Sequence, residues 1–304
     1  MYLEVLRQTG SRVGDSGLPM TKPKDFDFEK YSRGQKLFQE NVFSCTHAML
    51  TSLVCGMSAE NLIRPLVFTG QSDEPLKALR RYKRTFQYVG SWYFHDIFDE
   101  ESVAYKSLRA VRRQHNSVRN AMNSSEGDIS RLDNVSQYDM SLVQCGFIGV
   151  ILMYPQECGI QCTEEDLECF VYLWYCIGYM LGITDENNIC RGGYQNAWNI
   201  CKEIETDILR PALHDPPDHF EPMARAFADG MNLMLHFPLL SLNSCIATSP
   251  FRVRESYFAS RPTMSIADHL RVMFLHILVK LVRYIPPLRN HLNNALVGLI
   301  NARE

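Results

Sequence analysis

The strongest constraint on this chain is the spacing of its apolar residues, which recur every three or four positions over most of its length. Leu167, Phe170, Val171, Trp174 and Ile177 form one such series. This is the period of an α-helix that turns one face toward a core, whereas a half-buried strand alternates apolar and polar residues. No convincing alternating run occurs, so the pattern predicts an all-α fold.

Capping residues and prolines mark where the expected helices begin. Ser136 precedes Gln137, and Thr163 lies three residues before Asp166, both of which are typical of helix starts. Pro75 suits the first turn of a helix, and Gly182 suits a helix end. One helix is expected to begin near residue 31 and another at residue 137. Further helices are expected over residues 43–57, 75–94, 101–122, 164–181, 198–209, 220–234 and 265–284. A short helix is expected after Pro286-Pro287.

The 304 residues contain no repeat and no obvious linker, so one multi-helix domain over residues 26–304 is the simplest organisation. The first 25 residues are rich in Gly, Ser, Pro and Lys and are interpreted as a flexible arm. The net charge of −3 argues against a general nucleic-acid binder. The N-terminus lacks the apolar core of a secretory signal. We therefore expect an intracellular protein, either cytoplasmic or peripherally attached to the endoplasmic reticulum membrane.

Ten cysteines are present, but none forms the C-x-x-C pairs of a zinc site. Cys162, Cys169 and Cys176 are seven residues apart and so share a helix face. We interpret the cysteines as buried, reduced core thiols, with disulfides and metal or redox roles as the alternatives.

A histidine interrupts one apolar helix face. Leu108, Val111, Val118 and Met122 continue the spacing 3, 4, 3, 4 only when His115 is included. The imidazole is therefore expected to be buried, where an unpaired polar group costs about 1–3 kcal/mol. Its partner could be a carbonyl, another side chain or a metal. Position alone favours an ordinary hydrogen-bonded core histidine, and a metal ligand is the alternative.

The preceding helix carries a basic cluster. Arg81 and Thr85 are four residues apart and share a face, with Arg84 beside them. Residues 75–120 contain ten Lys or Arg against four Asp or Glu. A basic surface beside an apolar slot suits a ligand with an apolar body and acidic groups, such as haem with its propionates. An ordinary solvated helix face is the alternative.

Other chemistry finds little support. The histidines at 47, 95, 236, 269 and 276 are weaker candidates, since no H-E-x-x-H pair occurs. G-x-S-x-G, G-x-x-x-x-G-K and strand-associated G-x-G-x-x-G motifs are also absent. A zinc hydrolase, a Ser or Cys hydrolase and a phosphoryl-transfer enzyme are therefore unsupported.

Four short motifs occur in order along the chain, namely Thr69-Gly70, Arg81-x-x-Arg84-Thr85, Arg112-Arg-x-His115-x-x-Val118-Arg119 and Gln137-x-Asp139-Met140. Together they resemble the catalytic domain shared by bacterial latex-clearing rubber oxygenases and the endoplasmic-reticulum-bound fungal oxygenases of mycophenolic acid biosynthesis. The likeness extends from about Phe26 to about Asp229-Gly230. It implies a globin-related helical bundle that holds haem b.

The resemblance also implies roles for single residues. His115 matches the proximal iron ligand, and Arg112 and Arg119 on the same helix are expected to bind the cofactor with it. Arg81, Arg84 and Thr85 match a catalytic Arg-x-x-Lys-Thr group near the distal side or the haem edge, and Arg81 is also expected to bind the cofactor.

One departure is that the family's lysine, which can occupy the sixth position on iron, is Arg84 here. A guanidinium does not deprotonate and is a poor ligand. The sixth site is therefore expected to be open or water-filled, with Arg84 as a hydrogen-bond donor.

No carboxylate could be assigned as a distal base from the motifs. Glu60, Asp73 and Glu74 lie in the appropriate part of the chain, but none stands out. Gln137 and Asp139 are expected to fix helix ends and orient the His115 helix rather than to touch substrate.

The activity that the resemblance implies is attack by O₂ on a carbon–carbon double bond of an isoprenoid or other lipid-like chain, giving a carbonyl product. Two alternatives remain open at this point. One is a non-catalytic protein that binds or senses haem or a lipid, and the other is a helical interaction scaffold without haem.

The strongly apolar segment 272–284 contains Lys280 and Arg283. The C-terminal helices over residues 265–304 could therefore contact a membrane interface, with packing onto the core as the alternative.

Overall fold

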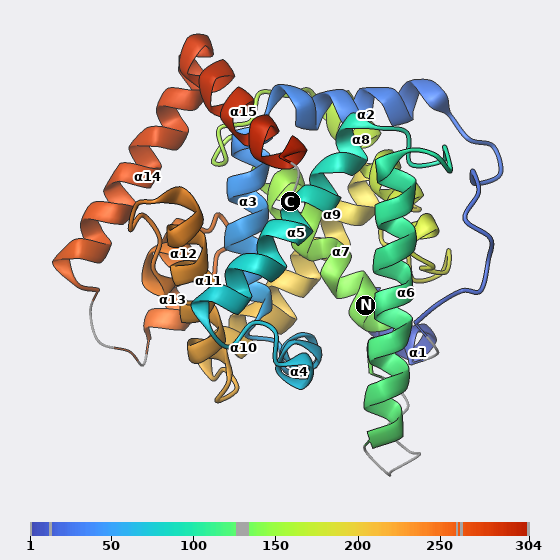
Figure 1. Cartoon of the computed structure of the whole chain (residues 1–304), viewed down its shortest axis with the longest axis horizontal. Coiled ribbons are helices and arrows are strands. Elements are labelled where there is room, and N and C mark those ends of the chain that lie inside the picture. The colour runs from blue at the N-terminus through green and yellow to red at the C-terminus, as the bar shows by residue number, and fades with distance from the viewer. Residues whose placement is uncertain (1, 12–13, 126–133, 260, 262–263, 303–304) are drawn as a thin grey trace.

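Helix α7 (Gln137–Met153) lies at the centre of the fold, as the apolar residues on nearly all its sides predicted. In the computed structural model it packs against α1 (Tyr2–Gly10), α3 (Val42–Gly56), α8 (Glu164–Met180) and α9 (Gly193–Ile204) (Figure 1). The structure describes residues 2–11, 14–125, 134–259, 261 and 264–302.

The described residues form helices and no strands, so the all-α prediction is confirmed, and they make up a single helical domain. The remaining elements are α2 (Phe28–Glu40), α4 (Glu60–Thr69), α5 (Pro75–Phe94), α6 (Val103–Ser125), the π-helix η2 (Glu205–Leu209), α10 (Arg210–His214), α11 (Phe220–Leu235), α12 (Leu242–Thr248), α13 (Arg254–Phe258), α14 (Ile266–Tyr284) and α15 (Pro286–Asn301).

The capping signals in the sequence placed two helix starts correctly. The Ser136 hydroxyl accepts from the backbone N–H of Asp139 at 3.1 Å, and the Asp139 carboxylate accepts from the backbone N–H of Ser136 at 2.9 Å. Thr163 and Asp166 form the same reciprocal pair at the start of α8. Each pair satisfies two N–H groups that the first turn of a helix leaves free.

The predicted flexible arm needs correction, because much of residues 1–25 is anchored to the fold. Leu3 and Leu6 of α1 are buried against the core. Farther along, the Ser16 N–H donates to the Gly182 carbonyl at 2.8 Å. The Gly, Ser and Pro content of the segment hid these contacts, because composition reports neither buried leucines nor distant backbone partners.

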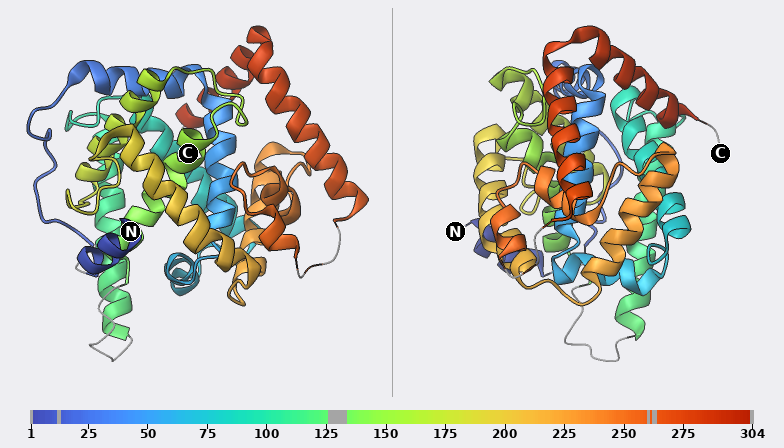
Figure 2. Two further views of the ribbon diagram at one scale, coloured as in Figure 1. Left: turned by 180° about the vertical axis from the view of Figure 1, so that it is seen from behind. Right: turned by 90° about the vertical axis from the view of Figure 1, so that its left-hand side faces the viewer.

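Several other helices differ from prediction. Helices α1, α10, α12 and α13 were not expected, and the helix expected over residues 198–209 begins at Gly193 and continues into the π-helix η2. Helix α4 was not expected, since Pro65 stands inside it and proline interrupts the hydrogen bonding of a helix interior. The final helix, α15, is not short but has 16 residues. With α14 it lies along the outside of the molecule, over α3 and α5 (Figure 2).

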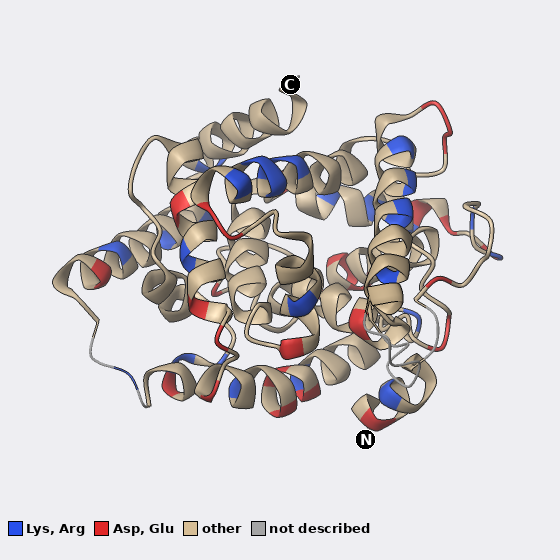
Figure 3. Ribbon diagram, turned by 60° about the horizontal axis from the view of Figure 1, so that its bottom comes forward, with Lys and Arg blue, Asp and Glu red and all other residues tan. Residues whose placement is uncertain are grey.

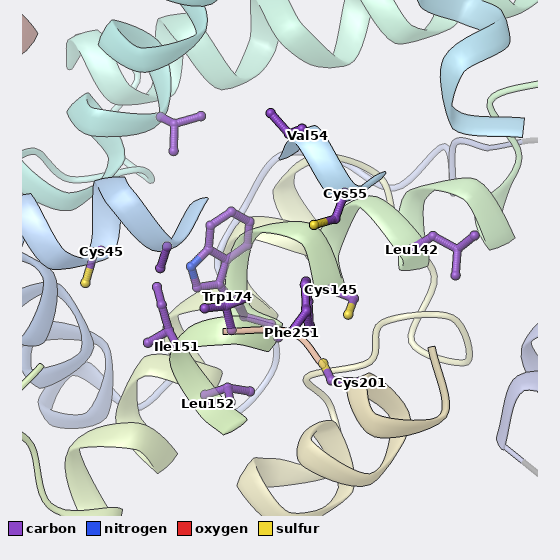
Figure 4. Close-up of a cluster of buried hydrophobic side chains, with 14 of the residues drawn as sticks. Cys45, Val54, Cys55, Leu142, Cys145, Ile151, Leu152, Trp174, Cys201 and Phe251 are labelled. Carbon is purple, nitrogen blue, oxygen red and sulfur yellow. The ribbon is translucent and has the colours of Figure 1, made fainter. Parts of the chain in front are cut away.

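The cysteines are core residues, as predicted. All ten are free thiols, and all but Cys162 are buried. Four of them, Cys45, Cys55, Cys145 and Cys201, lie in a buried cluster with apolar side chains such as Val54, Trp174 and Phe251 (Figure 4). Burial raises the pKa of Cys55 to about 12, so this thiol stays protonated and unreactive.

Among the described residues, no single helix is both long and apolar enough to cross a membrane. Helices α3 and α4 meet that criterion only as a pair, and the chain bends by 92° between them.

Candidate functional site

A large cavity lies between α4, α5, α6, α7 and α8, and His115 forms part of its wall. It contains about 1520 Å³ of space free of protein atoms, including the part open to solvent at its mouth. The lining is mostly apolar, with Val111 and Val118 on either side of His115 along α6. We call this space the His115 cavity.

The imidazole of His115 lacks the hydrogen bond that a core histidine normally makes. Its Nδ1 is buried and has no partner. Burial and, to a smaller extent, the positive charges of Arg119 and Arg81 together lower the pKa of the ring to about 4. The ring is therefore neutral at ordinary pH, with a lone pair available on one nitrogen. This is the form of imidazole that binds a metal.

The predicted group on α5 also reaches this cavity. Arg81, Arg84 and Thr85 all contribute to its lining. Arg81 is held in place, since its Nη1 donates to the hydroxyls of Thr69 at 2.9 Å and Ser72 at 3.1 Å. Arg84 and Thr85 are exposed, and the Thr85 hydroxyl donates to the Arg81 carbonyl at 3.0 Å. A fixed guanidinium and a more accessible one therefore share the cavity with His115.

Arg112 and Arg119 do not belong to the cavity lining, although both were expected to bind the cofactor. Arg112 donates to the carboxylate of Asp15 through Nε at 2.9 Å and through Nη2, and also to the Leu18 carbonyl. Arg119 donates to the Val135 carbonyl through Nε at 3.0 Å and Nη2 at 2.9 Å. The two arginines fix α6 on either side of His115 instead of facing a ligand.

None of the three carboxylates considered as a distal base lies on the cavity wall. Asp73 and Glu74 pair with Lys77, at 3.1 Å and 2.9 Å respectively. Glu60 is exposed in the first turn of α4. The carboxylate that does line the cavity is Asp139, which sequence reasoning had interpreted as structural.

Asp139 keeps that structural role while it faces the cavity. Besides capping α7, its carboxylate accepts a hydrogen bond from the Asn61 amide of α4. Gln137 ties the start of α7 to the end of α8, through the Gly182 carbonyl and the Thr184 N–H, each at 2.9 Å. These two residues fix helix ends as expected. The charge of Asp139 also acts on Arg119 of α6, the helix that carries His115.

A second cavity adjoins the first, because the two share part of their lining, and it contains about 1160 Å³ of space, including the part open to solvent. Its lining is almost entirely apolar, with residues from α3, α5, α7, η2 and α11. Two hydroxyls in that lining, those of Thr46 and Ser52, are buried without a hydrogen-bond partner. We call this space the inner cavity. Residues that line both cavities are Leu53, Leu62, Leu66, Tyr82, Thr85, Val89, Val143 and Phe147.

The surroundings of the His115 cavity are basic. Helix α6 carries five Lys or Arg and no acidic residue over its length, a pattern that can be followed in Figure 3. The other histidines that the sequence offered, at positions 47, 95, 236, 269 and 276, do not line this cavity.

These features fit a haem better than a bare metal ion. Within the described parts of the chain, no group of three or more His, Cys, Asp or Glu side chains could hold a metal. A metal bound to His115 would therefore need its other ligands from a group such as a porphyrin. The cavity offers the apolar walls, one unpartnered imidazole and accessible guanidinium groups that a porphyrin with two carboxylates requires.

Comparisons with known proteins agree with this architecture. The family described as "ER-bound oxygenase mpaB/B'/Rubber oxygenase, catalytic domain" matches residues 44–284. A solved structure of latex clearing protein LCP in the closed state has a TM-score of 0.56 and 16% sequence identity. That alignment covers 98% of this chain and 84% of LCP, and at this identity it shows a shared fold. No curated protein sequence matches the chain.

Proposed function

This chain belongs to the family of ER-bound oxygenase mpaB/B′ and rubber oxygenase catalytic domains, and on that premise we propose that it is a haem b-dependent oxygenase. Its substrate would be an apolar isoprenoid or lipid-like molecule with a carbon–carbon double bond, attacked with O₂. The observation that carries the proposal is the neutral His115 ring, whose Nδ1 is buried without a partner at the wall of a large apolar cavity.

In this proposal His115 is the protein ligand of the iron, and bound haem supplies the centre that activates O₂. Arg81, fixed by Thr69 and Ser72, places a positive charge beside the cavity. Arg84 donates hydrogen bonds to a haem carboxylate or to bound substrate, because a guanidinium stays protonated and cannot take the lysine's place on iron. The apolar walls exclude water from the reacting double bond.

The inner cavity is the proposed substrate site. Its apolar lining adjoins the His115 cavity through shared residues such as Leu53 and Val143. Cleavage of one double bond by one O₂ gives two carbonyl groups, so the atoms and electrons balance without an external reductant. A long unsaturated chain could therefore lie in the inner cavity with one double bond near the haem.

The unpartnered hydroxyls favour a substrate that carries an oxygen function. A buried hydroxyl without a hydrogen bond costs about 1–3 kcal/mol, which a substrate hydroxyl or carbonyl would offset. Ser52→Ala and Thr46→Val should weaken binding of an isoprenoid alcohol several-fold. The same variants should bind the corresponding hydrocarbon as the wild type does.

An absorption spectrum tests the haem assignment. Protein expressed with haem supplementation should show a Soret band that is lost in His115→Ala. A control variant, His95→Ala, removes an exposed histidine away from the cavity and should keep the band. Wild-type protein without Soret absorbance would refute the proposal, and a helical interaction scaffold would then be the better description.

A non-catalytic haem- or lipid-binding sensor is the second candidate. It is favoured by one observation, namely that the carboxylate lining the described cavity wall, Asp139, is already engaged by Asn61 and by the cap of α7. Oxygen consumption separates the two. An oxygenase should take up O₂ when an unsaturated isoprenoid is added, whereas a sensor should bind the isoprenoid with no uptake.

A further inference from the structure

Helix α14 has two apolar sides, and only one of them faces the core. Val272, Leu275, Val279 and Val282 are buried. Along the opposite side, large apolar residues are exposed over the whole helix, from Ile266 at 82% to Tyr284 at 73%; the others are Leu270, Met273, Phe274, Ile277 and Leu281. One side of the helix therefore packs onto the core, and the other side leaves its apolar residues exposed. So long an apolar row on a surface is typical of an interaction site.

The exposed apolar surface continues onto the end of α11. Leu233, Leu235 and Phe237 are exposed there, Phe237 at 60%. This segment is attached to α14, since Arg271 Nε donates to the Pro238 carbonyl at 3.1 Å. We call the row on α14 and this segment together the α14 face. Helix α14 lies at the outer edge of the molecule (Figures 1 and 2).

A groove with about 2120 Å³ of free space runs along one edge of the α14 face. His276, Lys280 and Arg283 line it at spacings of four and three, so they form a row beside the apolar one. Three more arginines line it from other elements, namely Arg210, Arg252 and Arg254.

Positive charge dominates this groove. Its lining contains five Lys or Arg against two acidic residues, Glu157 and Glu255. One of these, Glu157, already pairs with Arg252 at 2.7 Å. Burial lowers the pKa of His276, and the charges of Arg254 and Lys280 lower it further. The groove therefore has an unbalanced positive field that an anion would stabilise.

Two donors in the groove wall lack partners. Arg210 donates to the buried Glu205 through Nη2 at 3.0 Å, but its Nε is buried and unpaired. Ser249 is only 8% exposed and its hydroxyl has no hydrogen-bond partner, although it lies beside the weakly bonding thiol of Cys55. A phosphate oxygen is a strong acceptor for donors of these two kinds.

We propose that the α14 face docks on an anionic phospholipid bilayer, with the apolar row in the interface and a lipid phosphate in the basic groove. Amphipathic helices with a basic edge bind anionic lipid surfaces in this way. The charges complement such a surface, because α14 and α15 carry four Lys or Arg against the single acidic residue Asp268, in a chain of net charge −3. This surface is separate from the His115 cavity and does not depend on haem.

Vesicle flotation tests the charge requirement. Wild-type protein should float with vesicles of phosphatidylcholine plus phosphatidylserine, and far less with phosphatidylcholine alone. Arg254→Gln/Lys280→Gln should reduce partitioning on the order of 20-fold, since each basic residue near such a surface contributes about fivefold. The matched control, Arg109→Gln/Arg113→Gln, removes two exposed charges from α6 and should float like the wild type. Equal partitioning into both vesicle types would overturn the proposal.

The apolar row is tested with Phe274→Ser/Ile277→Ser, which should abolish flotation because it removes two exposed side chains from the row. Val103→Ser, an exposed apolar residue on α6, is the control and should float normally. A second copy of this chain is the rival occupant. A stable dimer in sedimentation velocity that Phe274→Ser/Ile277→Ser dissociates would assign the face to that copy and overturn membrane docking.

Competition by inorganic phosphate tests the groove as a built site. Phosphate should release protein from anionic vesicles more effectively than chloride at equal ionic strength. Equal effects would mean diffuse charge attraction only, and would overturn the headgroup site. His115→Ala should float like the wild type, so a failed haem assignment and a failed docking surface give different results.

Discussion

Arg112 on α6 holds Asp15 of the N-terminal segment in a two-point pair, with Nε 2.9 Å from Oδ2 and Nη2 bonded to Oδ1. Arg112 lies three residues before His115 in the same helix. The pair therefore fastens the first residues of the chain next to the His115 cavity. It explains how a segment with the composition of a loose arm becomes an ordered part of the fold.

The pair should make stability depend on pH at the acidic end. Burial opposes ionisation of Asp15, but bonds from Arg112, Asn116 and the Gly17 N–H outweigh it and lower its pKa to about 2, from an ordinary 3.8. A lowered folded-state pKa contributes stability that is present above pH 3.8 and lost as pH falls toward 2. Thermal unfolding from pH 6 to pH 2 should show this loss.

Asp15→Asn is the matching variant. Its free energy of unfolding should be about 1–2 kcal/mol lower than that of the wild type at pH 6, and the two values should converge at pH 2. A constant difference between the two proteins across this range would contradict the assignment of the lowered pKa.

A buried charge cluster supports the π-helix. Glu205 is fully buried and accepts hydrogen bonds from Tyr154 at 2.6 Å, Lys202 at 2.9 Å and Arg210 at 3.0 Å. Glu205→Gln leaves two cations without their counter-charge. Because those cations are about one third exposed, we expect a loss of about 2 kcal/mol rather than the full cost of a broken buried pair.

Urea unfolding measures this loss. Glu221→Gln breaks comparable but more exposed pairs with Arg225 and Arg261 and should cost less than about 1 kcal/mol. Equal effects of the two variants would show that the Glu205 cluster adds nothing beyond a surface pair.

The elements that the sequence predicted best are those with local signals. Pro75 marked the start of α5, and the Ser136 cap marked the start of α7, because a helix start depends on residues within one turn. Gly182 follows the end of α8 with a φ of +85°, which favours glycine. A Cβ at this position would also lie only 2.7 Å from Asp15 Oδ1. Helix α4 was missed because Pro65 is a local signal of the opposite kind, which packing overrides.

The residues of the candidate site also fall into two groups, those that local spacing predicts and those that depend on distant partners. Helical spacing was enough to place His115 on an inward face, and the pairing of Arg81 with Thr85 followed from their separation of four residues. The partners of Arg112 and Arg119 could not be inferred, because one is a carboxylate 97 residues away and the other is a backbone carbonyl. Nor could spacing show that Asp139 both caps a helix and faces the cavity.

The unpartnered Nδ1 of His115 predicts a conflict between stability and function. In haem-free protein, His115→Leu should raise the free energy of unfolding by about 1 kcal/mol, because it removes an unsatisfied polar atom from the interior. His95→Leu alters an exposed ring and should give no such gain. A loss of stability in His115→Leu, measured by urea unfolding, would mean that the imidazole has a partner in solution.

Replacing Arg84 by lysine tests why this chain departs from the family pattern. Arg84 lines the His115 cavity, and its guanidinium stays protonated at all practical pH values. The wild-type ferric protein, loaded with haem, should therefore be high-spin near neutral pH, as for an open or water-filled sixth site, and should change at alkaline pH only through ionisation of a bound water. An amine can lose its proton and bind iron, so Arg84→Lys should convert to a low-spin spectrum with a nitrogen ligand as pH rises.

Arg80→Lys, the same exchange at an exposed α5 position outside the cavity lining, should behave like the wild type. If Arg84→Lys and the wild type have the same spectrum at each pH between 6 and 10, residue 84 lies out of reach of the iron, and its proposed place beside the haem is wrong.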